Sequence, residues 1–376
     1  MELAPANNNL NNIIIKATNH CCLKCDYCYI ESHQSKSVPE TIDLEKIKKL
    51  IIEYLKIITN SGDKIIKLTW HGGEPLLAGL SYFKKIVEIE KKLVLPPYRI
   101  MNSITTNAVE LNSEWISFFK ENNFQLGISL DGPENIHDKH RKFFSGAGSF
   151  QKVMQAIKIL QESNMAFGVL TVITSETAKS PNELFEFFLS NKIFNINFIP
   201  YSTPAEWLSP MEYSYFLIKF FDLWFDLNNP EFYVRDFSNI IARIFGLESN
   251  MCEYSNCFGN YLGLDTNGDI YMCDLLIGNK EFLMGNIKND TLEQVLTSPR
   301  FTMLQKTARK NSPSCQKCPL FLICTGGCMY RRFLDNSALP GKDIYCSSRK
   351  KIILHILSKL NESDKGGTGS LSCYKI

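Results

Sequence analysis

Apolar strand-like runs alternate with segments of helical periodicity through the first two thirds of the chain. Six of these runs are predicted strands: Asn12–Thr18, Ile65–Trp70, Arg99–Thr105, Gln125–Leu130, Phe167–Thr174 and Asn195–Pro200. The helical segments that follow them are Leu44–Ile58, Tyr82–Lys92, Ser113–Asn122, Phe150–Ser163, Pro181–Leu189 and Pro210–Leu227. This alternation is typical of parallel βαβ units. The pattern predicts an α/β fold, a partial (β/α)6 TIM-like barrel with its chemistry at the C-terminal ends of the strands.

The pattern changes near Ser238, where short segments rich in Cys, Gly, Asn and Asp replace the alternation. Such a composition indicates a small module organised by metal rather than by buried apolar area. Lys350–Leu360 is a predicted closing helix, and Glu362–Ile376 a predicted mobile tail. We therefore expect a barrel over residues 1–237, a metal-binding module over 238–349, and a helix and tail over 350–376.

Composition limits the partners that the chain can have. Its 41 Lys and Arg against 39 Asp and Glu leave a net charge of +2, which provides no field for holding nucleic acid. The longest apolar runs fall short of the roughly 18 residues that a membrane span requires. The N-terminus also lacks the basic start and apolar centre of a secretory signal. We expect a cytoplasmic protein whose partners include neither nucleic acid nor membrane.

Thirteen cysteines suggest metal ligation, because a cytosolic chain keeps its thiols reduced and rarely forms disulfides. The first group contains Cys21-x3-Cys25-x2-Cys28, directly after the first predicted strand. Three thiolates on a four-iron cluster leave one iron open to a substrate or cofactor. A zinc ion is the alternative ligand for this cysteine triplet.

A second motif, Trp70-His71-Gly72-Gly73-Glu74-Pro75, ends the second predicted strand. Its glycines allow close backbone approach to a ligand, and its carboxylate could accept an ammonium group, although alone it could be an ordinary turn. Together the two motifs resemble the radical S-adenosylmethionine (SAM) superfamily. The resemblance implies that Cys21, Cys25 and Cys28 hold a SAM-binding cluster. It also implies that Gly72, Gly73 and Glu74 hold the methionine amino group of SAM.

The resemblance extends to the fourth predicted strand and the segment after it. It implies that Ser129, in Ser129-Leu130-Asp131-Gly132-Pro133, and Arg141 contact the ribose and carboxylate of SAM. A polar strand end and a surface arginine are the alternatives. Tyr27 matches the aromatic residue common before the last cysteine of the loop. Ala108 stands where a Thr-Asn-Gly stretch usually has glycine, and Cys22 has no matching role.

The C-terminal cysteines supply eight thiolates, enough for two fully ligated four-iron clusters. Their spacing resembles a SPASM domain, the auxiliary-cluster module of radical SAM enzymes that modify peptides. The resemblance implies one cluster nearer to SAM, held by Cys252, Cys257, Cys273 and Cys328, and one farther away, held by Cys315, Cys318, Cys324 and Cys346. Two structural zinc ions are the alternative. The expected cofactors are thus SAM and three [4Fe-4S] clusters.

The implied reaction is reductive cleavage of SAM to a 5′-deoxyadenosyl radical, which takes hydrogen from a residue of a precursor peptide or protein. The auxiliary clusters would accept or relay an electron, and flavodoxin or ferredoxin would be the electron donor. The whole chain from Ile13 to Ile353 resembles anaerobic sulfatase maturases and related maturases of ribosomally made peptides. Asp274 matches the general base of the sulfatase maturases.

Two positions depart from the sulfatase maturases. His71 stands where they typically have Gln, and Ile30 stands where a Tyr is expected. The sequence therefore favours an intrapeptide side-chain crosslink of the cyclophane type over oxidation of Ser or Cys to formylglycine. A non-catalytic electron-transfer iron–sulfur protein is a third alternative. Because only 20 residues precede Cys21, a leader peptide is expected to bind the barrel edge, the SPASM module or a separate leader-binding protein.

Overall fold

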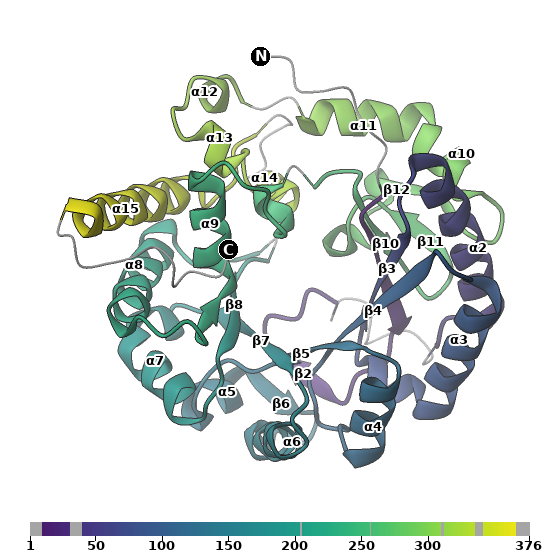
Figure 1. Cartoon of the computed structure of the whole chain (residues 1–376), viewed down its shortest axis with the longest axis horizontal. Coiled ribbons are helices and arrows are strands. Elements are labelled where there is room, and N and C mark those ends of the chain that lie inside the picture. Colours follow the sequence, from purple (N-terminus) through teal and green to yellow (C-terminus); the bar gives the residue numbers. More distant parts are fainter. Residues whose placement is uncertain are drawn as a thin grey trace. The chain divides into compact units, whose positions relative to one another are not determined.

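The structure is a computed structural model that describes residues 10–30, 40–203, 205–255, 257–309, 312–334 and 341–365. The chain forms two compact units, each assembled from three segments. Figure 1 labels their helices and strands. Residues 1–128, 142–167 and 258–306 make up the first unit, and residues 129–141, 168–257 and 307–376 make up the second. Within the described ranges, no helix is both long enough and apolar enough to cross a bilayer.

A sheet with the strand order β12-β11-β10-β1-β3-β4-β5 forms the base of the first unit. Its strands are β1 (Asn12–Thr18), β3 (Ile65–Gly72), β4 (Arg99–Thr106), β5 (Gln125–Ser129), β10 (Tyr261–Leu264), β11 (Asp269–Tyr271) and β12 (Leu283–Asn286). Strands β10, β1, β3, β4 and β5 are parallel, whereas β11 pairs antiparallel with both of its neighbours.

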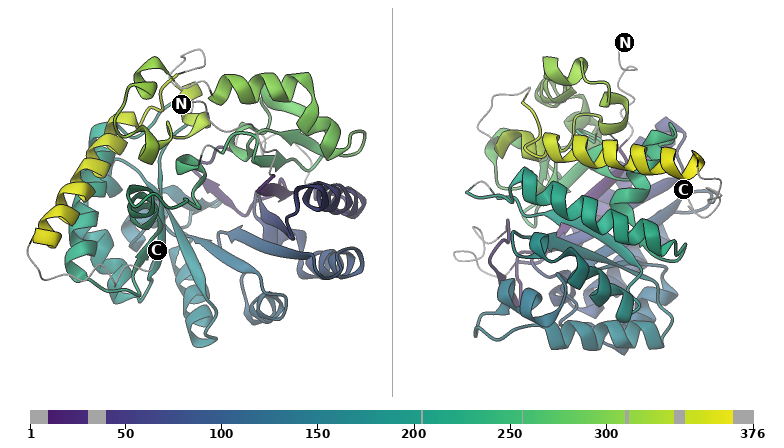
Figure 2. Two further views of the ribbon diagram at one scale, coloured as in Figure 1. Left: turned by 45° about the horizontal axis from the view of Figure 1, so that its top comes forward. Right: turned by 90° about the vertical axis from the view of Figure 1, so that its left-hand side faces the viewer.

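The helices of this unit follow its strands in the chain. They are α2 (Leu44–Ser61), α3 (Leu80–Leu93), α4 (Ser113–Glu121), α6 (Phe150–Glu162), α10 (Leu292–Thr297) and α11 (Pro299–Arg309). Helices α2 and α3 lie side by side on the outer face of the strands, as the left view of Figure 2 shows. This face of the sheet therefore packs against helices.

Side chains of β3 point alternately to the two faces of the sheet, so one set packs in the core against the helices and the other set lies on the opposite face. Trp70 is fully buried against Phe83 of α3, with their ring centroids 5.4 Å apart. The Trp70 Nε1–H donates to Asn102 Oδ1 at 2.8 Å, and Asn102 Nδ2 donates to Glu90 Oε2 at 2.9 Å. Successive strand residues point to opposite faces, so His71 lies on the face away from these helices.

The second unit contains three parallel strands, β7 (Phe167–Ile173), β8 (Asn195–Pro200) and β9 (Tyr233–Val234). Its main helices are α5 (Glu134–His140), α7 (Pro181–Ser190), α8 (Pro210–Leu227), α9 (Arg235–Ile244) and α15 (Cys346–Lys365). Short helices α12 (Pro313–Gln316), α13 (Phe321–Cys324) and α14 (Met329–Leu334) carry the C-terminal cysteines. Phe198 packs edge-on against Phe216 and Phe220 in the core.

The six predicted strands and the six helices after them are confirmed, with bounds that differ by less than one turn. The predicted α/β fold with parallel strands is confirmed as well. Strand β10 was expected in the metal-binding module, but it extends the first unit's sheet beside β1. Helix α15 runs to Lys365, past the expected start of the tail at Glu362, and Cys373 lies outside the described residues. The division at residues 237 and 349 stays a prediction.

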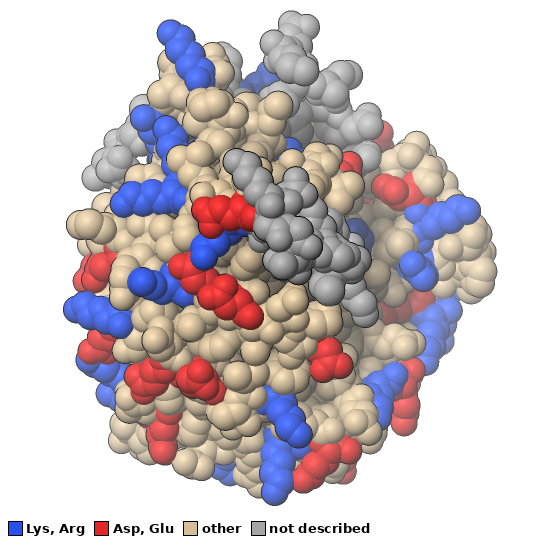
Figure 3. Space-filling view, turned by 60° about the vertical axis from the view of Figure 1, so that its left-hand side comes forward, with Lys and Arg blue, Asp and Glu red and all other residues tan. Residues whose placement is uncertain are grey.

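Charged side chains of both signs are interspersed on the face shown in Figure 3. This intermixing agrees with the net charge of +2. Among the charged residues visible in Figure 3, neither the basic nor the acidic side chains form one continuous patch.

Candidate active site

The cysteine triplet lies in a short loop of the first unit, immediately after β1. Strand β2 (Leu23–Cys25) and a turn in which the Cys28 N–H donates to the Cys25 carbonyl at 3.1 Å shape this loop. The side chains of Cys21, Cys25 and Cys28 are half-buried. The structure thus brings the three predicted cluster ligands into one loop at the C-terminal end of a parallel strand, where ligands usually bind.

Gly72 and Gly73 bring the end of β3 into contact with this loop. The Gly73 N–H donates to Thr18 O at 2.8 Å, and the Glu74 N–H donates to His20 O at 2.7 Å. A Cβ on Gly73 would lie 2.1 Å from His20 O, and Gly72 has a φ of +128°. Glycine is needed here because the backbone of the segment before Cys21 occupies the space of a side chain.

Glu74 is buried, with 1% of its surface exposed, and its carboxylate joins the turn that follows it to the end of β4. Its Oε1 accepts from Thr106 Oγ1 at 2.6 Å and from Leu76 N–H at 3.0 Å, while Oε2 accepts from Asn107 N–H at 2.8 Å. Burial raises the pKa of Glu74 to about 7, and these hydrogen bonds oppose the rise. A carboxylate offers about four acceptor positions, so Oε2 keeps capacity for a cationic or amino group. Its predicted contact with SAM stays a prediction.

Asn107 connects the end of β4 to the cysteine loop. Its Nδ2 lies 3.7 Å from Cys21 Sγ and 3.5 Å from Cys22 Sγ. Cys22, which had no predicted role, is thereby a partner of Asn107. Ala108 has a φ of +60°, a conformation that glycine adopts without strain. This backbone conformation explains why glycine is usual at that position in the motif.

Three polar side chains meet on the inner face of the first unit: Tyr29, His71 and Asp274. The Tyr29 hydroxyl lies 3.4 Å from Asp274 Oδ2 and 3.4 Å from His71 Nδ1. Asp274 follows Cys273 directly, and its Oδ1 lies 3.4 Å from Cys273 Sγ. A Cβ on Gly263 would lie 2.8 Å from the Asp274 Cα, so β10 approaches this turn closely.

Protonation in this cluster follows from burial. Burial raises the pKa of Tyr29 well above its usual range, and Asp274, Cys28 and Cys273 add to the rise. Burial also lowers the pKa of His71, although Asp274 opposes this effect. Tyr29 is therefore a hydrogen-bond donor to Asp274, and the neutral His71 can donate Nδ1–H to the tyrosine oxygen. The tautomer of His71 is assigned from this network.

Sequence reasoning missed Tyr29, because it expected a tyrosine at position 30. The turn after Cys28 brings Tyr29 to the carboxylate of Asp274, whereas Ile30 is buried with the apolar core. The signal available in the sequence was an aromatic residue one position earlier. Only the conformation of the turn decides which of the two positions faces Asp274.

In the second unit, Arg141 forms a two-point ion pair with Asp131. Its Nε lies 2.9 Å from Oδ2 and its Nη2 lies 3.2 Å from Oδ1, with both side chains buried. Asp131 Oδ1 also accepts from Val172 N–H at 3.0 Å. The alternative of a surface arginine is therefore wrong for Arg141. Contact of Ser129, Arg141 and Tyr27 with SAM stays a prediction.

Some C-terminal thiols of the second unit influence one another in two sets, Cys315 with Cys324 and Cys346, and Cys328 with Cys252. The division of the eight cysteines between two clusters stays a prediction. Burial raises the pKa of Cys315, and Cys346 and Cys324 raise it further. Burial likewise raises the pKa of Cys328 to about 12, and Cys252 adds to the rise. Positive φ angles at Thr325, at Gly326 and at Gly327 turn the chain between Cys324 and Cys328.

These thiols suit iron–sulfur clusters chemically. Buried thiols that raise one another's pKa are stabilised as thiolates only by a positive charge, which a cluster's iron provides. Within the described residues, no three His, Cys, Asp or Glu side chains close around one metal ion. Soft thiolates are the usual ligands of four-iron clusters, which are larger than a single metal ion. Cys273 belongs to the first unit, and Cys257 and Cys318 are half-buried residues of the second.

Comparisons with known proteins agree with this chemistry. The family descriptions "Radical SAM superfamily" and "Iron-sulfur cluster-binding domain" (SPASM) match residues 15–188 and 252–319. A serine-type anaerobic sulfatase-maturating enzyme of Bacteroides thetaiotaomicron is 30% identical over 89% of this chain and 86% of its own length. A cysteine-type enzyme of Clostridium perfringens is 28% identical over 93% of this chain and 97% of its own.

Solved structures show the same similarity. Native anSMEcpe with bound AdoMet and Cp18Cys peptide superposes with a TM-score of 0.84, covers 94% of this chain and 99% of that one, and is 28% identical. Streptococcus suis SuiB bound to its precursor peptide SuiA has a TM-score of 0.58 and 17% identity, over 88% of this chain and 74% of that one, so it shares the fold alone.

The chain belongs to the radical SAM superfamily, in the group that has a SPASM domain and includes the anaerobic sulfatase-maturating enzymes. It is accordingly an enzyme of SAM radical chemistry. Its cofactors are SAM and more than one [4Fe-4S] cluster.

Proposed function

We propose that the protein oxidises a cysteine or serine side chain of a peptide or protein substrate to formylglycine, as an anaerobic sulfatase-maturating enzyme. The observation that carries this proposal is the Asp274 carboxylate, which receives a hydrogen bond from Tyr29 at 3.4 Å beside the cysteine loop. Similarity over nearly the whole length of cysteine-type and serine-type maturating enzymes supports it. The two types match at nearly equal identity, so both side chains enter the test.

The reaction removes two hydrogens and leaves the products closed-shell. When bound, SAM and its cluster supply a 5′-deoxyadenosyl radical that takes one hydrogen atom from the substrate carbon, and an auxiliary cluster takes up one electron. Asp274 accepts the proton of the substrate thiol or hydroxyl. Serine then yields the aldehyde directly, and cysteine yields a thioaldehyde that water converts to the aldehyde with release of hydrogen sulfide.

Tyr29 and His71 position the base for this step. Because Tyr29 stays protonated, it donates to one oxygen of Asp274 and leaves the other acceptor positions for the substrate proton. His71 stays neutral, so it adds no positive charge that would weaken Asp274 as a base. This chain of hydrogen bonds supports a functional Asp274 although His71 and Ile30 depart from the typical maturase residues.

The roles of the other predicted site residues belong to the same proposal. Cys21, Cys25 and Cys28 would hold the SAM cluster, while Gly72, Gly73, Glu74, Ser129, Arg141 and Tyr27 would hold SAM itself. The eight C-terminal cysteines would hold two auxiliary clusters. A flavodoxin or ferredoxin would supply the electrons.

Cyclophane-type crosslinking, which the sequence favoured, receives less support than maturation. Its basis was the motif with His71 and the missing tyrosine at position 30, and Tyr29 now supplies a hydroxyl next to Asp274. The likeness to SuiB concerns the fold alone. Crosslinking and electron transfer without catalysis are therefore alternative outcomes of the test below. A requirement for a separate leader-binding protein is a further outcome.

The test uses the reconstituted enzyme, SAM, a strong reductant and paired peptides that differ only in Cys or Ser. We expect 5′-deoxyadenosine and a product that reacts with a hydrazide. Asp274→Asn should keep 5′-deoxyadenosine release and slow the product by about 10²–10⁴-fold. The matched control is Asp63→Asn, at an exposed aspartate outside this cluster. A crosslink would give a different result. Its product would not react with a hydrazide, and tandem mass spectrometry would show no fragments between the two joined residues.

A further inference from the structure

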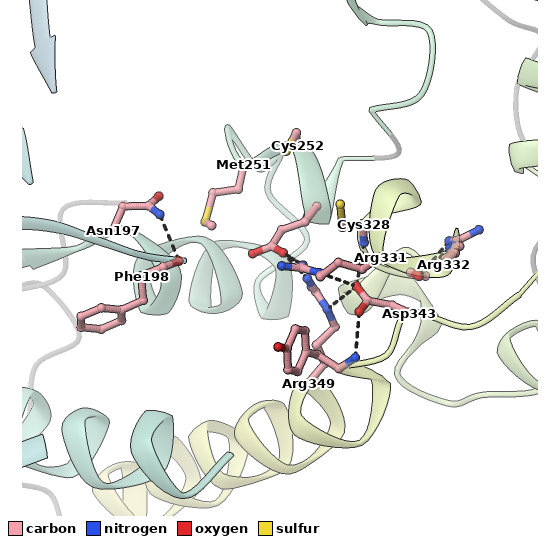
Figure 4. A network of polar contacts seen from close by, with 12 residues as sticks. Asn197, Phe198, Met251, Cys252, Cys328, Arg331, Arg332, Asp343 and Arg349 are labelled. Atoms are coloured by element: carbon pink, nitrogen blue, oxygen red, sulfur yellow. Dashed lines mark hydrogen bonds and ion pairs between the residues drawn. The ribbon is translucent and has the colours of Figure 1, made fainter. Parts of the chain in front are cut away.

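Four buried charges form a closed network in the second unit: Glu253, Arg331, Asp343 and Arg349 (Figure 4). Both arginines contact Glu253 Oε2 through their Nη2 atoms. Arg331 Nε lies 3.3 Å and Arg349 Nε 3.4 Å from Asp343 Oδ2. The side chain of Arg349 is only 5% exposed, and that of Asp343 only 1%. Taking four charges out of water is costly, so their mutual pairing is needed to offset the desolvation of each group.

Each member of the network lies within three residues of a predicted cluster ligand. Asp343 Oδ2 accepts the Cys328 N–H at 2.8 Å, and the Asp343 carbonyl accepts the Cys346 N–H at 2.9 Å. A Cβ on Gly327 would lie 2.3 Å from Asp343 Oδ2, so the chain before Cys328 is packed directly on this carboxylate. Glu253 follows Cys252. The network therefore joins loops that belong to both predicted auxiliary clusters.

Arg349 has donor capacity that the network does not use. Its Nη1 is buried and has no hydrogen-bond partner among the described residues. Its guanidinium carbon lies 4.6 Å from the centre of the Tyr254 ring, which holds the side chain in place.

Through Asp343, the guanidinium is thus connected to the backbone of Cys328 and Cys346, which are one predicted ligand of each auxiliary cluster. A four-iron cluster with four thiolates changes from a dianion to a trianion when it gains one electron. A buried cation favours the more negative state, and net charge and hydrogen bonds near the sulfurs are the main determinants of cluster potential.

We propose that Arg349 is a positioning residue that raises the reduction potential of the auxiliary clusters, so that they accept the electron released when the substrate is oxidised. Glu253 acts in the opposite direction, because its carboxylate offsets the guanidinium charge. The proposal rests on the assignment of the C-terminal cysteines to clusters and does not depend on the substrate.

The experiment is a redox titration of the reconstituted full chain, followed by the electron paramagnetic resonance signals of the reduced clusters. Arg349→Gln should shift the reduction equilibrium of an auxiliary cluster about tenfold toward the oxidised state, which is about 59 mV lower for a one-electron couple. Arg349→Lys keeps the charge, so its auxiliary-cluster potential should stay close to that of the natural protein. The SAM cluster is the internal reference, and Arg300→Gln, an exposed arginine that binds two carbonyls, is the matched control.

Glu253→Gln distinguishes an electrostatic role from structural damage. It leaves Arg349 less compensated and should raise the auxiliary potentials, whereas damage would shift both variants in the same direction. If Arg349→Gln fails to retain iron, the Glu253→Gln titration decides the question. Unchanged potentials in Arg349→Gln, or shifts of equal sign in both variants, would overturn the proposal. Failure to form formylglycine would affect only the proposed function, because these potentials are measured without a substrate.

Discussion

Adding one methyl group at Gly73 should push the end of β3 away from the segment that leads into Cys21. In Gly73→Ala the new Cβ would lie 2.1 Å from His20 O and 2.5 Å from His20 C. The loop must then move away, which breaks the hydrogen bonds from Gly73 N–H to Thr18 O and from Glu74 N–H to His20 O. Each such bond contributes about 0.5–1.5 kcal/mol, and overpacking costs roughly 1–3 kcal/mol. The variant should lose about 2–6 kcal/mol of unfolding free energy.

The displaced segment leads directly into Cys21, so cluster binding should be lost together with stability. We expect reconstituted Gly73→Ala to lose about a third of its iron, one cluster of three, together with SAM cleavage. The measurements are denaturant unfolding of the metal-free chain and iron per chain after reconstitution.

Gly168→Ala is the control for this prediction. Its φ is ordinary, and the nearest atom to the new Cβ is the exposed Asn195 side chain at 3.3 Å, which can move. This variant should stay within about 1 kcal/mol of the natural protein. The reasoning is refuted if Gly73→Ala unfolds at the same denaturant concentration as the natural protein and binds the same amount of iron.

Four other changes test separate parts of the structure. Tyr29→Phe should keep 5′-deoxyadenosine release but slow product formation by about 10–100-fold, since it removes one hydrogen bond to a charged base; chromatography of both products measures this, and equal slowing of both would contradict it. The carboxyl of Glu90 has a pKa raised by burial from 4.5 to about 7, so its share of stability is present below pH 4.5 and is lost as the pH rises to about 7. Glu90→Gln should therefore gain up to roughly 2–3 kcal/mol over the natural protein at pH 8 and nothing at pH 4.5, as measured by unfolding across this range. Asp131→Asn leaves the buried Arg141 without its carboxylate and should cost about 3–5 kcal/mol, seen as a lower Tm. Ser209→Ala removes the capping box at the start of α8 and should cost about 1 kcal/mol, and no change in Tm would mean that the cap is not needed.

The elements that the sequence predicted are those whose burial follows a simple period. Along β3, Ile66, Leu68 and Trp70 alternate with half-exposed residues, and this pattern is visible without a structure. The cysteine loop and the Gly-Gly-Glu turn could be placed for the same reason, since each follows a strand of this kind. Their position at the strand ends then follows from parallel βαβ connectivity.

Other features depend on contacts between residues far apart in the chain. Strand β10 has four residues and includes Gly263, so its pattern is that of a loop until it pairs with β1. Tyr29 and Asp274 are 245 residues apart, and only folding shows that the tyrosine before Ile30 reaches the carboxylate. The network around Arg349 was equally hidden, because each of its charges alone suggests a solvent-exposed residue.

The pairing of β10 with β1 has a consequence for dissecting the protein. Ile13 of β1 is opposite Leu262 of β10, and both are buried. A chain cut before β10 would leave one edge of β1 without hydrogen-bond partners, next to the loop of the first cysteine triplet. Exposed apolar strand edges pair with other chains and aggregate. The N-terminal part should thus be insoluble when expressed alone, because the first unit needs residues 258–306 to complete its sheet.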